Sequence, residues 1–385
     1  MKNITFKMPR KIEIGFSKSK ELGKIIKQEK FRKVLIVVDY NLKKMGSVNW
    51  LFNHLDEENI SFSIFDKIKN EPTISEIDQG INELKIADNY DGIIAIGGGS
   101  TIDLAKLFAV SSVMEGSVKN YLGTNTLEKR GIPTIVLPTT SGTGAEVTPN
   151  SIVKDTKKEC KTAVVSPYLI PDLVILDPEL TFSLPPKVTA ETGIDAFTHA
   201  IECFTCNKSN PMSDLFALDS IRLISKYLRR AFRNGEDKEA RYYMAIGSLY
   251  GGIAITNSGT GGVHALAYPL GGKYNFSHGL SNSILLSEVM AFNAKAVPKK
   301  FVKVAEAMGI EANTLSEDEI LKSVLQEIKK LINDVGISIG EFEISEKILQ
   351  NLATMAISEQ QRLLGNNPRP IFYEDAYKIY KESLL

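Results

Sequence analysis

Five short apolar runs rich in β-branched residues recur in the first half of the chain. They lack the polar–apolar alternation of a strand with one exposed face, which favours strands buried on both faces of a parallel sheet. Amphipathic stretches such as NWLFNHLDEEN (49–59) and TIDLAKLFAV (101–110) lie between them and predict helices, so this half reads as an α/β fold. The runs are KVLIVVD (33–39), SFSIFD (61–66), GIIAIGGGS (92–100), TIVLPTT (134–140) and DLVILD (172–177).

The second half has a different pattern, because from Pro186 onward nearly every stretch has helical periodicity. The clearest example is SEDEILKSVLQEIKKLINDVG, in which Ser316 and Glu319 predict a capping box and Gly336 predicts the end of the helix. Its apolar residues form one stripe: Ile320, Val324, Leu325, Ile328 and Leu331.

The length of the chain, 385 residues, exceeds the size at which a single core usually stops growing. We therefore predict two domains, an α/β domain over residues 1–185 and an all-helical domain over residues 186–385. No low-complexity linker separates them, so we expect close packing and a ligand-binding cleft between them.

Charge and apolar patterning narrow the class of partner. Lys plus Arg equals Asp plus Glu, at 46 each, which argues against nucleic acid or an anionic membrane as partner and favours small molecules. No apolar run approaches the roughly 20 residues that cross a bilayer, and the N-terminus lacks a signal-peptide core, so we expect a cytoplasmic protein. The cysteines Cys160, Cys203 and Cys206 are too few for a disulfide framework, and the last two predict small buried residues of a helix.

The stretch GIIAIGGGSTIDLAK predicts a strand, a glycine turn and a helix. Gly97, Gly98 and Gly99 let the backbone approach a ligand closely, and Ser100 with Asp103 is placed as N-cap and third residue of the helix. Free N–H groups and the helix dipole at this point would bind a pyrophosphate. The alternative is a tight turn without a ligand.

Two further segments lie at the same predicted edge of the sheet. The loop PTTSGTGAEVTPNSIV carries the hydroxyl groups of Thr139, Thr140, Ser141 and Thr143, where α/β sheets bind nucleotides. Asp39 ends the first run, where a carboxylate would accept hydrogen bonds from an adenosine ribose and repel a 2′-phosphate. As a strand-end turn residue, Asp39 needs no such role.

A possible metal site involves three of the four histidines. In GIDAFTHAIE, Asp195 and His199 lie four residues apart and so on one face of a helix. His264 and His278 flank a glycine-rich stretch and can join them only through tertiary folding. A carboxylate with neutral imidazoles suits a divalent first-row metal, whereas a helix-surface ion pair is the alternative for the first two. His54 lies in a charged stretch and predicts a solvated residue.

Seven motifs closely resemble those of the iron-containing (group III) alcohol dehydrogenases, in the same order. This resemblance implies a Rossmann-like α/β domain followed by an all-α domain, the dehydroquinate synthase-like fold. It also implies NAD(H) and one divalent metal, iron(II) or alternatively zinc, and a homodimer or larger homo-oligomer. The motifs are EPTISEI, GGGSTIDLAK, TTSGTGAEVT, GIDAFTHAIE, GGVHALAYPLGG, FSHGLSN and NNPRPI.

The resemblance also assigns roles to individual positions. The metal ligands would be Asp195, His199, His264 and His278. The cofactor would be held by Gly97, Gly98, Gly99 and Ser100 at the pyrophosphate, Thr139, Thr140 and Thr143 at the nicotinamide, and Lys161 and Asp39 at the two riboses. One position differs from the motif of the family, because Tyr268 lies where many relatives carry a histidine in HAxAH. A phenol, with a pKa of about 10, is a poorer base than an imidazole near neutrality, although it can still pass a proton.

The activity implied is hydride transfer between NAD(H) and a small primary alcohol, diol or aldehyde, with Asn150 a candidate for binding a second hydroxyl. A metal- and NAD-dependent lyase or cyclase of the dehydroquinate synthase type is the alternative. Its phosphate- and carboxylate-bearing substrate would require several basic side chains, and residues 257–282 offer only Lys273. A nucleotide-binding regulatory protein would not need the four ligand residues.

Overall fold

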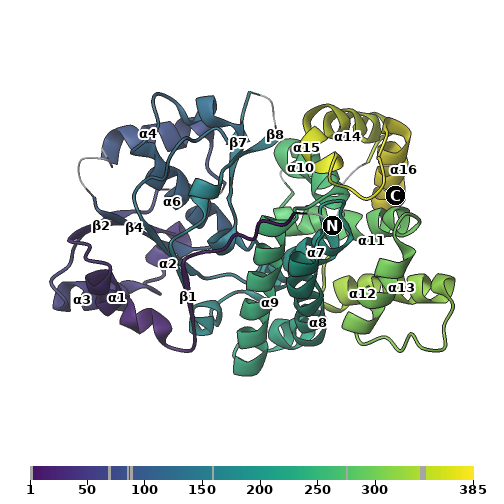
Figure 1. Ribbon diagram of the computed structural model, residues 1–385, viewed down its shortest axis with the longest axis horizontal. Coiled ribbons are helices and arrows are strands. Elements are labelled where there is room, and N and C mark those ends of the chain that lie inside the picture. Colours follow the sequence, from purple (N-terminus) through teal and green to yellow (C-terminus); the bar gives the residue numbers. More distant parts are fainter. Residues whose placement is uncertain are drawn as a thin grey trace. The chain divides into compact units, whose positions relative to one another are not determined.

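The computed structural model describes residues 3–67, 71–84, 86, 90–157, 160–274, 276–338 and 344–385. Within these residues the chain forms two compact units (Figure 1). The α/β unit comprises Lys7–Thr140 and Ala145–Phe182, and the helical unit comprises Met1–Phe6, Ser141–Gly144 and Ser183–Leu385.

The centre of the α/β unit is a six-stranded sheet in the order β1-β9-β6-β4-β2-β3, with all neighbouring strands parallel. All five apolar runs form strands of this sheet, which confirms their prediction as parallel strands. The sequence did not reveal β1, a short edge strand with little buried apolar surface. The strands are β1 (Lys11–Ile14), β2 (Lys33–Val38), β3 (Ser61–Phe65), β4 (Gly92–Gly97), β6 (Thr134–Pro138) and β9 (Leu173–Leu176).

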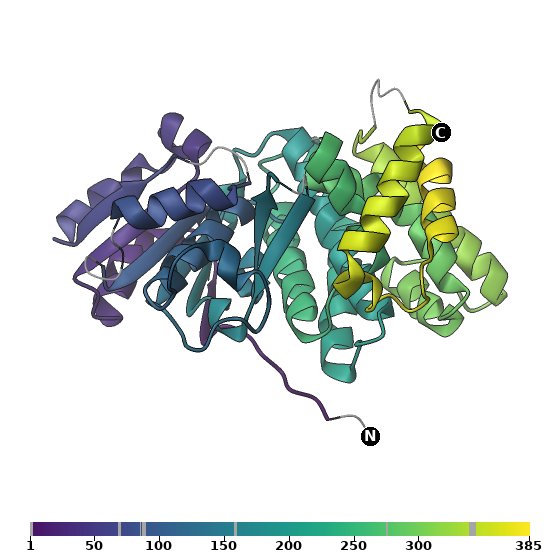
Figure 2. The same cartoon turned by 90° about the horizontal axis from the view of Figure 1, so that it is seen from above.

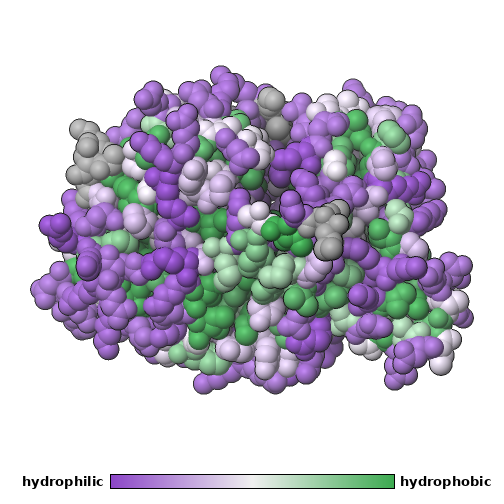
Figure 3. Space-filling view, in the orientation of Figure 1, coloured by the Kyte–Doolittle hydropathy of each residue, from purple (hydrophilic) through white to green (hydrophobic). Residues whose placement is uncertain are grey.

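Helices cover both faces of this sheet (Figure 2). On one face α1 (Leu22–Gln28) and α3 (Asn49–Glu57) pack their apolar side chains against β2, β4, β6 and β9. Their outer surface is mostly hydrophilic, as Figure 3 shows. α6 (Gly99–Ser111) contacts β2, β4 and β6 and is itself covered by α4 (Ile74–Leu84). The predicted helix is therefore confirmed, but it is not amphipathic, because it is buried from Thr101 to Val110 with both of its sides covered.

A second sheet of three strands, in the order β5-β8-β7, was not predicted. β5 (Gly123–Thr124) pairs in parallel with β8 (Cys160–Val165), and β8 pairs antiparallel with β7 (Asn150–Asp155). The polar loop predicted up to Val153 therefore ends before Asn150. In β7 the buried positions include the polar Ser151 and Asp155, which hide the usual alternation.

Three charged side chains, two of them on α6, are buried close together. The Lys106 ammonium donates to the Asn150 carbonyl oxygen at 2.8 Å and lies 3.2 Å from an Asp103 carboxylate oxygen. Burial raises the pKa of Asp103 and lowers that of Lys106. Burial also raises the pKa of Glu146, in the same unit, to about 7 from its ordinary 4.5, against the opposing effect of Lys106.

Replacing Glu146 by glutamine is expected to reduce the loss of stability at alkaline pH. Because the folded pKa of about 7 exceeds 4.5, this carboxyl stabilises the fold fully below pH 4.5 and loses that contribution as the pH rises through 7. The difference between these two pKa values corresponds to at most about 3 kcal/mol of unfolding free energy. Glu146→Gln should recover this stability at about pH 8 and have little effect on it at about pH 5. Urea unfolding at both pH values measures it, with the exposed Glu128→Gln as control. An equal change at both pH values would contradict the prediction.

The described residues of the helical unit from Pro186 onward contain helices and no strand. α7, α8 and α9 pack against one another, and α7 also contacts α10 and α11. The larger helices are α7 (Pro186–Thr205), α8 (Pro211–Arg233), α9 (Lys238–Asn257), α10 (Gly262–Tyr274), α11 (His278–Ala294), α12 (Pro298–Ala307), α13 (Glu317–Asp334), α14 (Glu346–Glu359) and α16 (Tyr373–Leu384).

Several local features of the helical unit agree with the predictions from the sequence. The capping box of Ser316 and Glu319 begins α13, and Gly336 follows its end with a positive φ of 70°. Cys203 and Cys206, at the end of α7, are free and buried, as predicted. Among the described residues, no helix is both long and apolar enough to cross a membrane.

Candidate metal centre

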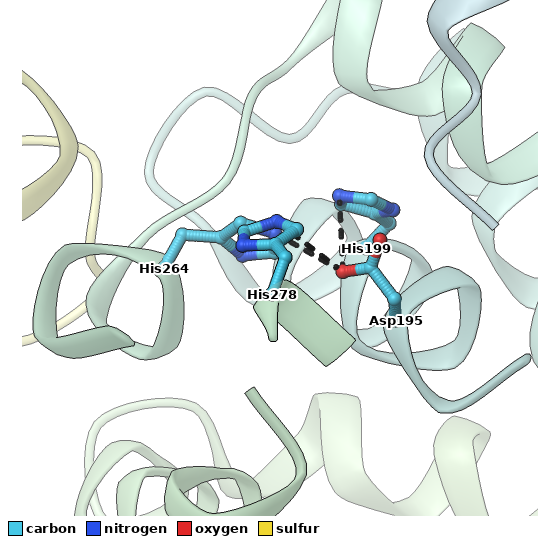
Figure 4. A group of neighbouring side chains, drawn as sticks. All are labelled: Asp195, His199, His264 and His278. Atoms are coloured by element: carbon cyan, nitrogen blue, oxygen red, sulfur yellow. Dashed lines mark ion pairs between the residues drawn. The ribbon is translucent and has the colours of Figure 1, made fainter. Parts of the chain in front are cut away.

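α7 supplies two side chains of the predicted metal set. It begins with Pro186 in its first turn, where a missing N–H costs nothing, and is buried along most of its length. Asp195 and His199 lie one turn apart and point to the same side of this helix (Figure 4).

The other two histidines lie near the starts of two later helices, α10 and α11. His264 is in the first turn of α10, and His278 is the first residue of α11. The N-cap of α11, Ser277, donates its hydroxyl to a carboxylate oxygen of Glu191 on α7 at 2.6 Å. This bond links the start of α11 to the helix that carries Asp195 and His199.

The four side chains converge around one point (Figure 4). One carboxylate oxygen of Asp195 lies 3.7 Å from Nε2 of His199, 3.7 Å from Nε2 of His264 and 3.5 Å from Nε2 of His278. The ligand atoms of all four residues lie within 4.8 Å of one another. One carboxylate oxygen and three imidazole nitrogens at these separations fit a single divalent transition metal.

Three polar groups that the sequence analysis missed hold these ligands. The Asn282 amide donates to the Asp195 oxygen at 2.7 Å, and the Gly142 carbonyl oxygen lies 3.3 Å from Nδ1 of His199. One carboxylate oxygen of Glu202 lies 2.5 Å from Nδ1 of His264. The positions of Glu202 and Asn282 were readable signals, since each lies one helical turn after a predicted ligand, on the same face.

The electrostatics of the cluster reflect burial and close charges. Burial alone would raise the pKa of Asp195, but the nearby His199 and His278 lower it. Burial lowers the pKa of His199. For His264 burial acts in the same direction, but the charges of Glu202 and Asp195 outweigh it and raise the pKa to about 9. Positive charge is therefore favoured at His264, next to two carboxylates, and disfavoured at the buried His199.

The predicted cofactor residues of the α/β unit lie at the ends of neighbouring strands. Asp39 follows β2, and its N–H donates to the Ile96 carbonyl oxygen at 3.0 Å. Thr139 follows β6, and its N–H donates to the Gly97 carbonyl oxygen at 3.0 Å. A side-chain carbon on Gly97 would lie 2.5 Å from the Thr101 hydroxyl oxygen, so the turn requires glycine there.

The helix after this turn begins earlier than predicted. Gly98 is the N-cap of α6, so Ser100 is its second residue and not its N-cap. The Asp103 carboxylate accepts from the N–H of Ile152 at 2.9 Å and does not cap the helix. The helix start therefore carries no side-chain cap, because glycine at the N-cap has no side chain to offer.

The remaining candidates occupy separate places. Lys161 lies on β8, buried, with its ammonium 2.6 Å from a carboxylate oxygen of Glu71. Thr143 belongs to the segment Ser141–Gly144 of the helical unit. Tyr268 lies one turn after His264 on α10, with its ring centre 6.0 Å from that of His278. His54 lies on α3, half-buried, with its ring edge against Trp50.

Comparisons with known proteins match nearly the whole chain. Residues 9–178 match the family model described as iron-containing alcohol dehydrogenase, and residues 189–384 match the C-terminal model of the Fe-containing alcohol dehydrogenase family.

Individual relatives agree with these matches. The chain is 40% identical to long-chain-alcohol dehydrogenase 1 of Geobacillus thermodenitrificans, over 96% of this chain and 93% of the relative. It is 32% identical to NAD-dependent methanol dehydrogenase of Bacillus methanolicus, over 98% and 99% of the two chains. A crystal structure of 1,3-propanediol oxidoreductase superposes with a TM-score of 0.94 at 32% identity, over 100% of both chains.

Proposed function

Because the chain belongs to the iron-containing alcohol dehydrogenase family and is an oxidoreductase with a His/Asp metal site, we propose that it interconverts a small primary alcohol or diol and its aldehyde. We propose NAD(H) as its redox cofactor and iron(II) as its metal, with zinc able to bind the same ligands. The observation that carries this proposal is the convergence of Asp195 with three buried or half-buried imidazoles.

The metal, when bound, supplies a Lewis acid for an alcohol or carbonyl oxygen, and the nicotinamide exchanges hydride with the carbon that bears it. The residues of the chain provide position and a dry environment. Asp195, His199 and His264 are buried, and Asn282 restrains the Asp195 carboxylate through its amide. Fixed ligands of this kind reduce the reorganisation that the reaction requires.

The proposed cofactor site uses the residues predicted from the sequence. Its support is the shared strand edge of the α/β unit, where β2, β4 and β6 end side by side and α6 begins. Backbone N–H groups at a helix start bind pyrophosphate well. The proposed set is Gly97, Gly98, Gly99 and Ser100 for the pyrophosphate, Thr139, Thr140 and Thr143 for the nicotinamide, and Asp39 and Lys161 for the riboses.

For proton transfer we propose Tyr268. It follows His264 by four residues on α10, so both side chains lie on one face of that helix, and its ring lies near that of His278. A phenol hydroxyl can donate and accept a hydrogen bond, which allows it to pass a proton between a substrate oxygen and solvent. Because its ordinary pKa is about 10, we expect it to act as a relay and not as a strong base near neutrality.

The reaction class is tested with the anaerobically iron-loaded protein, NADH and a panel of short- and long-chain aldehydes. We expect one NADH to be consumed for each alcohol formed, with no turnover after the metal is removed by a chelator and recovery when iron(II) is restored. In the reverse direction a primary alcohol and NAD should give NADH and aldehyde in equal amounts. Metal-dependent conversion of a substrate with no net change in NADH would indicate a lyase and contradict the proposal.

A further inference from the structure

α7 carries a further carboxylate, that of Glu202, on the face that holds Asp195 and His199. Glu202 follows His199 by three residues and Asp195 by seven, which places all three on one side of the helix. Glu202 as a whole residue is only 2% exposed. A carboxylate buried this deeply is costly unless hydrogen bonds satisfy both of its oxygens.

Both oxygens of Glu202 have partners at the start of α10. One accepts from the N–H of Val263 at 2.6 Å, and the other lies 2.5 Å from Nδ1 of His264. The first bond fixes the carboxylate against the backbone next to His264, and the second fixes the imidazole itself. A carboxylate accepts only, so the Nδ1 of His264 must carry the proton that it donates.

The tautomer decides which nitrogen can bind a metal. With the proton on Nδ1, the lone pair of His264 is on Nε2, the nitrogen that lies 3.7 Å from the Asp195 carboxylate oxygen and faces the centre of the cluster. The two buried carboxylates, Asp195 and Glu202, also bring two negative charges that a divalent ion would balance. The Gly142 carbonyl oxygen stands in the same relation to Nδ1 of His199, at 3.3 Å, but carries no charge.

We propose that Glu202 is a positioning residue that holds His264 in the Nδ1-protonated tautomer and thereby sets the affinity of the cluster for a divalent metal. The inference rests on the metal site of the proposed function and deepens it. Glu202 does not touch the metal or the substrate in this role. It acts through His264, as carboxylates behind metal-binding histidines commonly do.

The critical variant is Glu202→Gln, which keeps the size of the side chain. A glutamine has one acceptor oxygen, so it cannot accept from both the Val263 N–H and the His264 Nδ1–H with separate oxygens. If its oxygen stays on Val263, its amide group faces Nδ1 and favours the tautomer with the proton on Nε2, which opposes metal binding. We expect zinc affinity, measured by competition with a chromogenic chelator, to fall about 10- to 100-fold.

A second measurement reads the tautomer directly. The chain has four histidines, so a protein labelled with 15N-histidine gives few signals, which single histidine substitutions assign. In the zinc-loaded unmodified protein we expect His264 to carry its proton on Nδ1. In zinc-loaded Glu202→Gln we expect this signal to weaken or to show the other tautomer.

The matched control is Asn367→Ala, because the Asn367 side chain also anchors the start of α10, where its oxygen accepts from the N–H of Gly262 at 3.0 Å. Its other hydrogen bonds go to the Asn293 side chain and the Arg369 carbonyl oxygen. This control distinguishes the effect of loosening the start of α10 from the effect of changing the His264 tautomer. An equal loss of zinc affinity in both variants, with the His264 tautomer unchanged in each, would overturn the proposal, as would unchanged affinity and tautomer in Glu202→Gln. Failure of the metal site itself looks different, because zinc would then bind equally well to His278→Ala.

Discussion

Replacing either His264 or His278 by alanine is expected to weaken metal binding by more than about 100-fold and to abolish alcohol oxidation, since loss of a mere supporting residue behind a ligand already costs about 10- to 100-fold. Each histidine supplies one of four converging ligand atoms, and each comes from a different helix, α10 or α11. Elemental analysis of the metal per chain after dialysis, together with NADH formation, measures both effects.

His54→Ala is the control for these two variants. His54 lies on α3 in the α/β unit, with its ring against Trp50, so its removal should leave metal content and activity unchanged. A double variant of His264 and His278 that retained full metal and full activity would place the metal elsewhere in the protein.

The unmodified protein is expected to prefer NAD over NADP by at least about 100-fold in kcat/KM, because a few kcal/mol of repulsion between a carboxylate and a 2′-phosphate corresponds to two or more decades. The carboxylate is that of Asp39, at the end of β2, next to the end of β4. Removing its charge should raise the use of NADP and lower the affinity for NAD. Steady-state kinetics with both cofactors gives the two ratios.

The hydrogen bonds of Asp39 show which substitution removes only its charge. One carboxylate oxygen of Asp39 accepts from the N–H groups of Asn41 and Leu42, at 2.8 and 3.1 Å, and so caps the short helix α2 (Tyr40–Lys44). Asp39→Asn removes the charge and keeps the cap, whereas Asp39→Gly removes both at a cost of only a few tenths of a kcal/mol. Both should shift selectivity in the same direction. Equal use of the two cofactors by the unmodified protein, or unchanged selectivity in Asp39→Asn, would leave Asp39 with the capping role alone.

The sequence predicted the central sheet well because its four inner strands, β2, β4, β6 and β9, are buried on both faces. Such strands need apolar residues at every position, as in β2 and β4, and the resulting runs stand out. The hairpin of β7 and β8 failed to stand out because Ser151 and Asp155 fill buried positions of β7. Their burial depends on contacts made elsewhere in the fold, such as the hydrogen bond from the Ser151 hydroxyl to the Asp103 carbonyl oxygen.

The metal site could likewise be predicted only in part, where it depends on local sequence and not on tertiary packing. The spacing of Asp195 and His199 follows from helical geometry, so it could be predicted from residue types alone. The approach of His264 and His278 depends on the packing of α10 and α11 against α7, which no local pattern encodes. The spacing of Glu202 from His199 was a weak signal, because a glutamate in a helix is ordinary, and its 2% exposure and its two partners are what single it out.

The segment Ser141–Gly144 has a consequence for dividing this protein into parts. It lies between β6 and β7 along the chain, yet it packs with the helical unit, where a side-chain carbon on Gly144 would lie 2.5 Å from the backbone of Gly252. The same segment provides the Gly142 carbonyl oxygen beside His199. A fragment that begins at Ser183 would therefore contain all four metal ligands but lack this partner of His199. The helical unit is not a contiguous module, and a recombination between relatives with a single crossover at residue 183 would combine a His199 from one parent with a Gly142 loop from the other.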